Sequence, residues 1–537
     1  MQPVLNVEDV GHVEESLTEA GVSISELMRR AGSAVAHEVS RMGEVHDVAV
    51  LTGFGNNGGD GWVAAEELLK AGVHVTVVTP VEIDAIHSDL ARVVAQGARK
   101  VGVGVMVAPP RDQLEALLLS ADVAVDAMLG TGFHGAVRAP FSIWIKTLNS
   151  SGVRVVSADV PSGLSAQTGL ISGPFVIADV TVTMLVLKPG LLSDVGRDAC
   201  GSIIVAPLAE QTARLVREAD PVAWRPDLDD YVDVVGSSSV AVDKYSRGSV
   251  LVVGGSTRFP GAPMMAARAA ARAGAGYVTL AVPAPIAGIC QAQSMEIPVV
   301  ALPADNDGCF SLRAHDLIRA LAEKRSATLV GPGMRVSGST VSMVSTLLEC
   351  DVPLIIDADG LNCLARLTSN HLDYFPELLR RKKPLILTPH RGELGRLVGL
   401  ADTPPNSLTS AMEAARRIVW SDGGSELCVI AKGNATACVS ADVALLPKPG
   451  PAALATAGSG DVLGGIVAAL LSGAHIDMDN LPLLAAYACE IHGQAGAIAA
   501  EHFGTHGVMA TDVINSVGLA VDAIEQQVTY PEAVDGQ

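Results

Sequence analysis

Two glycine-rich segments combine small residues with aspartate in a pattern that suits phosphate binding and proton transfer. The first is Asn56-Asn57-Gly58-Gly59-Asp60-Gly61 and the second is Gly458-Ser459-Gly460-Asp461. Glycines in such a turn let backbone N–H groups converge on an anion at the positive end of a helix. An aspartate beside that anion can accept or return a proton. The 537-residue chain therefore contains two candidate phosphate-handling modules, separated by about 400 residues, which is too far for one ordinary domain.

Aspartates also begin two further loops in the first half of the chain. Asp126 and Asp159 each follow an apolar run that reads as a strand, and glycine-rich or Pro-Ser-Gly segments come after them. Any one strand-end aspartate can simply tie a turn. Three such loops at one sheet edge favour a site, and we predict Asp159 as its acid/base group.

The first loop also contains a literal G-x-G-x-x-G match, Gly53 to Gly58. Alone, this match is weak evidence for a dinucleotide fingerprint, because no ribose-binding acid follows the second strand at the expected place. The side-chain oxygens of Asn56, Asn57 and Asp60 suit a hard cation or a proton transfer instead. An ordinary NAD-dependent dehydrogenase is thus disfavoured.

Composition excludes several classes of function. The 37 basic and 58 acidic residues leave a formal charge of −21, which repels nucleic acids and anionic membranes. Eight cysteines without a C-x-x-C pair predict buried thiols in a reducing compartment rather than disulfides or a zinc site. No signal peptide or apolar run of about 20 residues is evident, so we expect a soluble cytoplasmic protein.

The elements that must position these loops read as alternating strands and helices. A helix over 23–39, a strand over 48–52, a loop over 53–60, a helix to about residue 71 and a strand over 73–78 predict a βαβ unit and hence a parallel sheet. Sequence over 209–246 loosens into a charged, proline-containing boundary that includes Ser237-Ser238-Ser239. Strands then resume over 249–253, 277–282, 328–330, 353–357, 384–388 and 427–431, and a tail begins near Tyr530. The predicted fold class is α/β throughout, with two domains.

The three loops of the first half, in this order, resemble the YjeF N-terminal family of NAD(P)H-hydrate epimerases over residues 7–208. The resemblance implies a Rossmann-like domain over 1–220 and a potassium ion held by Asn57, Asp126 and Ser162. Lys188 matches another family position, although a surface lysine that closes a strand explains it equally well. The implied contacts to the hydrated cofactor are Asn56, Asn57, Gly58, Gly59, Asp60, Gly130, Thr131, Gly132, Phe133, His134, Gly135, Ala136 and Asp159.

The loops of the second half resemble the ribokinase-like YjeF C-terminal family of NAD(P)H-hydrate dehydratases over residues 243–518. The resemblance implies a layered α/β domain over 235–530 that uses ADP, because fusion to an epimerase looks bacterial, together with Mg²⁺ on the phosphates. Asp461 would be the catalytic base. The implied nucleotide contacts are Lys432, Gly433, Asn434, Ala435, Thr436 and Gly460, and the implied hydrate contacts are Ala262, Gly333, His390 and Asp461.

The predicted protein is therefore a bifunctional repair enzyme for damaged nicotinamide cofactors. Its first domain would interconvert the R and S hydrates, and its second would dehydrate the S form while converting ADP to AMP and phosphate. Two alternatives stay open: a ribokinase-like kinase of a vitamin with an accessory dinucleotide-binding domain, and a non-catalytic dinucleotide sensor. The alanine-rich helices are compatible with packing between subunits of a homo-oligomer.

Overall fold

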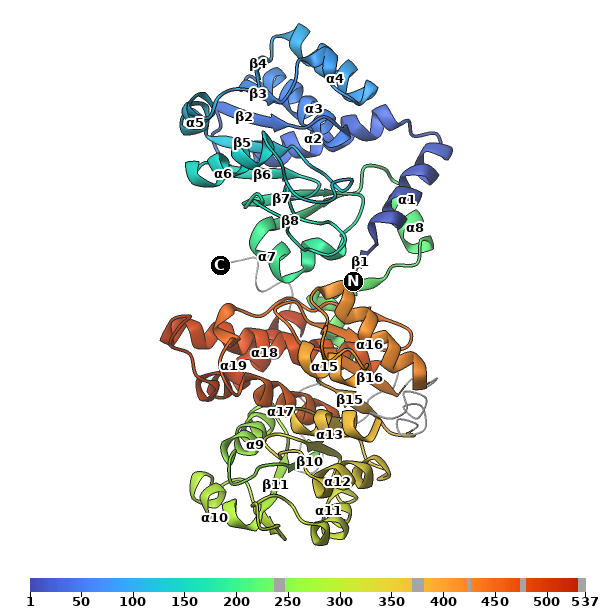
Figure 1. Ribbon diagram of the computed structural model, residues 1–537, viewed down its shortest axis with the longest axis vertical. Helices are drawn as coiled ribbons and strands as arrows, with labels where there is room; N and C mark the ends of the chain where they lie inside the picture. Colours follow the sequence, from blue (N-terminus) through green and yellow to red (C-terminus); the bar gives the residue numbers. More distant parts are fainter. Residues whose placement is uncertain (236–246, 369–380, 423–425, 474–479, 530–537) are drawn as a thin grey trace. The chain divides into compact units, whose positions relative to one another are not determined.

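The computed structural model describes residues 1–235, 247–368, 381–422, 426–473 and 480–529 (Figure 1). The serine run at 237–239, the start of the second resemblance at 243 and the tail from Tyr530 lie outside these residues. Two compact units are present. One comprises Pro3–Ala223 with Ser407–Thr409, and the other comprises Met1–Gln2, Trp224–Asn406 and Ser410–Gln537.

The first unit is built on a seven-stranded sheet whose described pairings are all parallel, in the order β4-β3-β2-β5-β6-β7-β8. This confirms the predicted parallel sheet. The strands are β2 (Asp47–Thr52), β3 (His74–Thr79), β4 (Gly104–Val107), β5 (Val123–Ala127), β6 (Arg154–Ala158), β7 (Val180–Met184) and β8 (Ser202–Ala206). The helices are α1 (Val7–Glu19), α2 (Ile24–Ser40), α3 (Asn56–Lys70), α4 (Asp89–Val101), α5 (Arg111–Ser120), α6 (Phe141–Ser151), α7 (Asp194–Cys200) and α8 (Thr212–Glu218).

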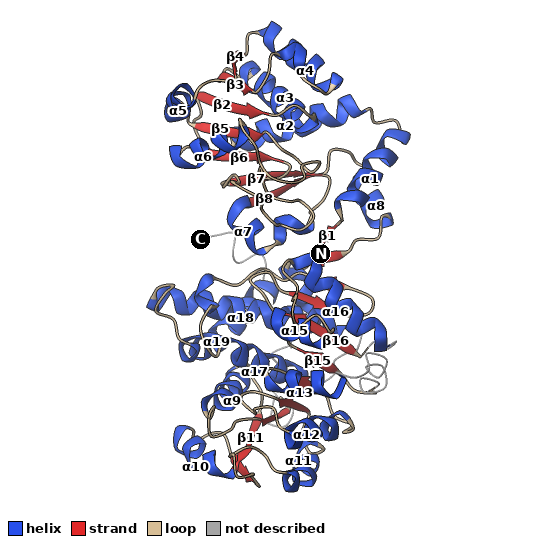
Figure 2. Ribbon diagram, viewed as in Figure 1, coloured by secondary structure: helices blue, strands red, loops and turns tan. Residues whose placement is uncertain are grey.

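Helices cover both faces of this sheet (Figure 2). Val48 and Val50 of β2 join one core with side chains of α2, α3 and α4, whereas Ala49 and Leu51 join a second core with α5 and α6. The alternation follows from the two-residue period of a strand, and burial on both faces explains the continuous apolar runs.

The second unit contains a larger, mixed sheet in the order β1-β9-β18-β17-β16-β15-β14-β13-β10-β11-β12. Pairing is parallel from β12 through β16, and β17 and β18 run antiparallel to their neighbours at β16 and β17. The strands are β1 (Gln2–Val4), β9 (Ala223–Arg225), β10 (Ser249–Val253), β11 (Tyr277–Pro283), β12 (Val299–Leu302), β13 (Ala327–Val330), β14 (Leu354–Ile356), β15 (Leu385–Leu387), β16 (Leu427–Ala431), β17 (Ala437–Val439) and β18 (Ala444–Leu445).

Helices pack against this sheet as well, which confirms the α/β class of the second half. The apolar faces of α9, α17, α18 and α19 share one core with β10, β11 and β13. The helices are α9 (Gly261–Arg272), α10 (Ala284–Gln293), α11 (His315–Ala322), α12 (Gly338–Leu348), α13 (Asp359–Thr368), α15 (Arg391–Leu397), α16 (Leu408–Asp422), α17 (Ser459–Ser472), α18 (Leu481–Phe503) and α19 (Ala510–Thr529).

One local prediction was wrong. Residues 56–60 were expected in a loop, but α3 begins at Asn56, so this segment forms the first turn and a half of that helix. Only Gly53 to Gly55 connects β2 to α3.

The predicted state of the cysteines is confirmed, because all eight are buried and unpaired. No helix of the described chain is both long and apolar enough to cross a membrane.

Candidate active sites

A cavity of about 650 Å³ opens at the carboxyl ends of β2, β5, β6 and β7 in the first unit. This is the edge at which ligands bind in open parallel sheets. Most of the predicted hydrate contacts meet here. The lining comprises Val10, Glu14, Phe54, Gly55, Asn56, Asn57, Asp60, Met128, Leu129, Gly130, Thr131, Gly132, Phe133, His134, Asp159, Met184 and Lys188.

Four of the predicted contacts do not line this cavity. Gly58 and Gly59 are buried in α3, where a side chain at Gly58 would collide with the carbonyl oxygen of Gly53 and one at Gly59 with Met28. Their role is to let the helix approach its neighbours. Gly135 and Ala136 are exposed beyond the cavity wall.

Asp159 and Lys188 form a buried ion pair on the cavity wall. The Lys188 ammonium donates to Asp159 Oδ1 at 2.5 Å, to Thr183 Oγ1 at 2.9 Å and to the Met184 carbonyl at 2.8 Å. All three of its protons are therefore used, and only 1% of the residue is exposed. The surface-lysine interpretation is wrong. Asp159 also has φ +65°, an uncommon conformation for a non-glycine residue that clusters at functional sites.

Asp60 and Glu14 line the same cavity without a side-chain partner among the described residues. Withdrawal from water, then the negative charges of Asp159 and Glu14, raise the pKa of Asp60 well above its ordinary value. Partial desolvation and then Asp159 also raise the pKa of Glu14, although its side chain stays accessible to solvent. Glu14 lies on α1 and belongs to none of the predicted motifs. The sequence around it indicates only an amphipathic helix.

The three residues predicted to hold a cation converge on the loop after β5. Asp126 is fully buried and accepts from Ser157 Oγ at 3.0 Å, from Ser162 N at 2.8 Å and from Ser162 Oγ at 2.6 Å. Burial raises the pKa of Asp126 in spite of these bonds. Asn57 contacts Gly130, and its amide nitrogen and oxygen are both buried without a hydrogen-bond partner. An orphaned amide oxygen beside a buried acid fits a bound monovalent cation.

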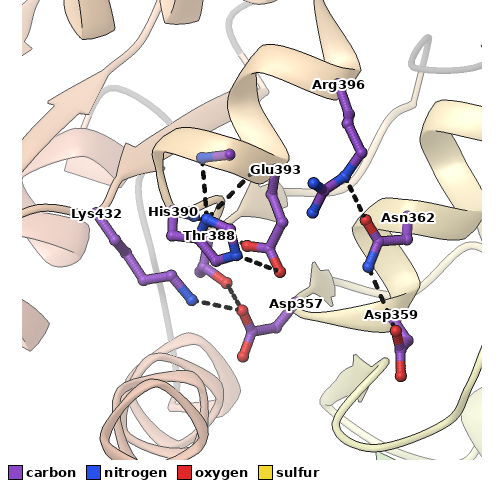
Figure 3. Close-up of polar contacts among 9 residues, drawn as sticks. Asp357, Asp359, Asn362, Thr388, His390, Glu393, Arg396 and Lys432 are labelled. Carbon is purple, nitrogen blue, oxygen red and sulfur yellow. Dashed lines mark hydrogen bonds and ion pairs between the residues drawn. The ribbon is translucent and has the colours of Figure 1, made fainter. Parts of the chain in front are cut away.

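In the second unit, the loops after three adjacent parallel strands bring a lysine, an aspartate and a threonine together (Figure 3). Asp357 follows β14, Thr388 follows β15 and Lys432 follows β16. Asp357 Oδ1 accepts from Lys432 Nζ at 2.7 Å and from Thr388 Oγ1 at 2.6 Å. Burial alone would lower the pKa of Lys432, but the neighbouring carboxylates, led by Asp357, outweigh it and the net shift is upward. The predicted nucleotide-binding lysine is thus held as a fixed cation.

Helix α17 begins beside this lysine. Gly458 caps the helix at φ +90°, a left-handed conformation that favours glycine. A side chain at Gly460 would begin 3.3 Å from Lys432 Nζ, so the ammonium lies at the positive end of the helix. A lysine next to the free N–H groups of a first helical turn makes an anion site.

Asp461 stands in the first turn of α17 with its carboxyl unpaired among the described residues. Burial, then the negative charge of Asp357, raise the pKa of Asp461 to about 7, although Lys432 opposes the shift. A carboxyl group that titrates near neutrality suits general acid/base catalysis. The geometry therefore combines an anion site with a proton acceptor, as the sequence predicts.

His390 serves as the N-cap of α15. Its Nδ1 accepts from the backbone N–H of Gly392 at 3.0 Å, and the backbone N–H of His390 donates to Glu393 Oε2 at 2.9 Å. Burial and the nearby Lys432 lower the pKa of His390, so the ring is neutral at pH 7. Burial raises the pKa of Glu393 to about 7. The solvent-facing edge of the ring is available to a ligand, since half of the side chain is exposed.

The remaining predicted contacts follow β10, β13 and β16. Ala262 lies in the first turn of α9, and the others lie in loops. A side chain at Gly333 would come within 3.1 Å of Ala262 Cβ, so these two predicted hydrate contacts are adjacent. Gly433 to Thr436 form a turn closed by a Thr436 Oγ1 donation to the Gly433 carbonyl at 3.0 Å. Asn434 and Gly433 are exposed in it. Asp357, Thr388 and Glu393 were not predicted as site residues, although the strand-end position of the first two is a signal that finds them.

Comparisons with known proteins agree on both halves. A family model described as YjeF-related protein N-terminus matches residues 24–190, and one described as NAD(P)H-hydrate dehydratase matches residues 250–518. A protein of Salinibacter ruber named bifunctional NAD(P)H-hydrate repair enzyme Nnr is 35% identical over 94% of this chain and 93% of its own. A protein of the same name from Coxiella burnetii is 32% identical over 96% and 98%, respectively.

A solved structure that resembles the second half is the ADP/ATP-dependent NAD(P)H-hydrate dehydratase of Bacillus subtilis, co-crystallised with ATP and Mg²⁺. It is 23% identical, with a TM-score of 0.44, and the match covers 55% of this chain and 97% of that one.

Proposed function

The chain belongs to the family of bifunctional NAD(P)H-hydrate repair enzymes, and we propose that its two units divide the two reactions of that repair between them. The domain over 1–220 exchanges the R and S epimers of the hydrated cofactor. The domain over 235–530 dehydrates the S epimer to NADH or NADPH. The observation that carries this division is that each unit has its own acid-bearing site at the carboxyl edge of its own sheet.

Dehydration uses ADP as the phosphoryl donor. Asp461 accepts the proton of the hydrate's hydroxyl group, and that oxygen attacks the terminal phosphorus of ADP, so that AMP leaves. The N–H groups of the first turn of α17, with Lys432, offset the charge that develops on the transferred group. Phosphate then departs together with a ring proton, and the double bond of the dihydronicotinamide is restored.

The nucleotide occupies the side of this site formed by the Lys432 to Thr436 turn and Gly460. Ala262, Gly333 and His390 face the hydrate. Mg²⁺ would be carried mainly by the phosphates of the nucleotide, as is usual for this ion. It would neutralise phosphate charge there.

Epimer exchange takes place in the cavity of the first unit. The residues that line it, from Asn56, Asn57 and Asp60 to the 130–134 loop and Asp159, contact the hydrated cofactor. Asn57, Asp126 and Ser162 would hold potassium, which would satisfy the orphaned Asn57 amide oxygen and the buried Asp126 carboxylate. Eight unpaired, buried cysteines support a reducing compartment, and we place the protein in the cytoplasm.

The test is an assay with mixed hydrate epimers and ADP. Full recovery of the absorbance of the reduced nicotinamide is expected, because exchange feeds the R epimer to the dehydratase. Asp461→Asn should abolish recovery and leave epimer exchange intact, whereas Asp442→Asn, at an exposed position of the same unit, should change neither. Failure to consume hydrate, or phosphorylation of a vitamin in its place, would refute the assignment. ATP run beside ADP tests the choice of donor.

A further inference from the structure

The cavity of the first unit adjoins a second chamber of about 550 Å³. The two share four wall residues: Glu14, Asn56, Asp60 and Met184. We call the junction of the two chambers at these four residues the neck. The rest of the second chamber is lined by Gly11, Glu15, Thr18, Glu19, Ile24, Leu27, Met28, Ala31 and Leu208. The residues of the predicted motifs line only the first chamber and the neck. The sequence pattern therefore does not predict the second chamber.

The two chambers differ in charge. The second has an apolar wall, which includes Leu27, Met28 and Leu208, and an acidic rim with Glu15 and Glu19, and no lysine, arginine or histidine lines it. A phosphate group placed there would face carboxylates alone. An uncharged ring suits it, because apolar side chains cover its faces and the carboxylates accept from its amide. The dihydronicotinamide hydrate is such a ring.

The first chamber suits the phosphates. It receives the N-terminus of α3 at Asn56 and the glycine-rich 130–134 loop, whose backbone N–H groups favour anions. With the pyrophosphate held there, the nicotinamide end of the dinucleotide reaches the neck. The carbon that carries the added hydroxyl group then lies between Glu14 and Asp60.

The carboxylates of this cavity are not equivalent. Asp159 Oδ1 is held by the Lys188 ammonium at 2.5 Å, so this carboxylate already has a buried partner. Asp60 and Glu14 have no such partner within the described chain, and both face the neck. Desolvation, and then the negative charge of Asp159, raise the pKa of both carboxyl groups, and the rise is greater for Asp60, which suits Asp60 as the proton donor.

We propose that the hydrate ring lies in the neck and that Asp60 and Glu14, rather than Asp159, transfer the protons of epimer exchange; this assignment rests on the epimerase function proposed for the first unit. Protonated Asp60 donates to the hydroxyl group, the C–O bond breaks and water leaves. The lone pair of the ring nitrogen forms a C=N bond. A solvent water then adds to the other face of that carbon, and its proton passes to the Glu14 carboxylate. Proton exchange with solvent then restores the protonated Asp60 and the Glu14 carboxylate.

The experiment uses the full chain with Asp461→Asn, so that dehydration does not drain the S epimer. Purified R hydrate is incubated in ¹⁸O-labelled water, and its conversion to the S epimer and the label in the product are followed by chromatography and mass spectrometry. In Asp60→Asn, exchange should fall by about 10²–10⁴-fold, the range for loss of a general acid. Glu14→Gln should also lose most of the rate. Glu115→Gln, on the exposed surface of α5, is the matched control and should exchange at the parent rate.

Binding of NADH, measured by fluorescence, separates catalysis from folding, and Asp60→Asn should keep its affinity. Glu14 is solvent-accessible, so Glu14→Gln gives a second, structurally mild variant. Near-parental exchange in Asp60→Asn, or exchange without incorporation of label, would overturn the Asp60 step. Loss in Asp60→Asn with full activity in Glu14→Gln would overturn the paired mechanism. If the parent chain exchanges no epimers at all, the epimerase function itself fails.

Discussion

The rate of dehydration should rise with pH through about 7, because Asp461 must be deprotonated to accept the hydroxyl proton. Burial first, and then the charge of Asp357, raise the pKa of Asp461 to about 7, against the attraction of Lys432. Other charged groups that face it are Asp359 and Glu393, and both carboxylates raise its pKa further. The acidic limb of kcat/KM reports this ionisation in the free enzyme.

The size of the effect follows from the titration curve. At pH 6 about one-tenth of the Asp461 carboxyl groups are ionised, and at pH 8 about nine-tenths are, so kcat/KM should change about tenfold across that interval. With an ordinary aspartate pKa near 3.9, the same interval would produce almost no change.

Two variants should shift the acidic limb of the pH profile of kcat/KM in opposite directions. Asp357→Asn removes the charge that raises the pKa of Asp461, so the limb should shift to lower pH. Lys432→Met removes the cation that lowers it, so the limb should shift to higher pH, with a lower plateau because the nucleotide loses a contact. The assay is the initial rate of NADH recovery from S hydrate and ADP between pH 5 and 9, with thermal unfolding as a check on folding. A pH-independent rate in the parent chain, or shifts of the same sign in both variants, would refute Asp461 as the base.

Three further outcomes are expected. Lys188→Met should destabilise the first unit by about 3–5 kcal/mol in denaturant unfolding, because Asp159 loses its partner in a buried ion pair. A second change, Asp159→Asn, should restore part of the loss, and an unaltered midpoint contradicts this. Asn57→Ala should remove the stimulation of epimer exchange by K⁺ over Li⁺, and persistent stimulation would place the ion elsewhere. Gly458→Ala should lower stability by at least about 1 kcal/mol in thermal unfolding, since φ is +90° and the new methyl group meets Met265 Cε at 2.7 Å, and a neutral effect would contradict the cap geometry.

The buried parallel strands were predictable because each is a run of apolar residues that ends in a turn, and β10 and β16 have the predicted bounds. The short edge strands were not. β17 spans Ala437–Val439 and β18 spans Ala444–Leu445, and runs of two or three apolar residues occur equally often in loops and helices. Their pairing is fixed by neighbours on the sheet rather than by local preference.

The prediction of a loop over residues 56–60 was wrong for a specific reason. Glycine disfavours a helix interior by about 1 kcal/mol relative to alanine, so three glycines in six residues predict a loop. In the structure these glycines are required by packing, because a side chain at Gly61 would come within 2.6 Å of Ala127 Cβ. Close approach of α3 to β2 and β5 outweighs the helix propensity, and the sequence alone does not reveal that contact.

The sequence could nominate candidate site residues where a motif fixes both type and position, as for Asp461 and Asn57. Lys188 was ambiguous, since a lysine after a strand is usually solvated, and only its three hydrogen bonds show that it is buried. Glu14 was not predictable, because it reaches the cavity from a helix that is remote in sequence. Such residues depend on tertiary placement rather than on local pattern.

Both units contain the same electrostatic arrangement. In each, a strand-end aspartate is paired with a lysine, Asp159 with the buried Lys188 and Asp357 with the partly buried Lys432. A second carboxyl group near each pair has no partner within the described chain. Burial raises the pKa of the unpaired carboxyl group, and the negative charge of the paired aspartate raises it further. A raised pKa favours the protonated form of the unpaired carboxyl group and so suits it to general acid/base catalysis. On this reasoning, the motif aspartates Asp159 and Asp357 position the charges, and the proton moves through Asp60 in the first unit and Asp461 in the second.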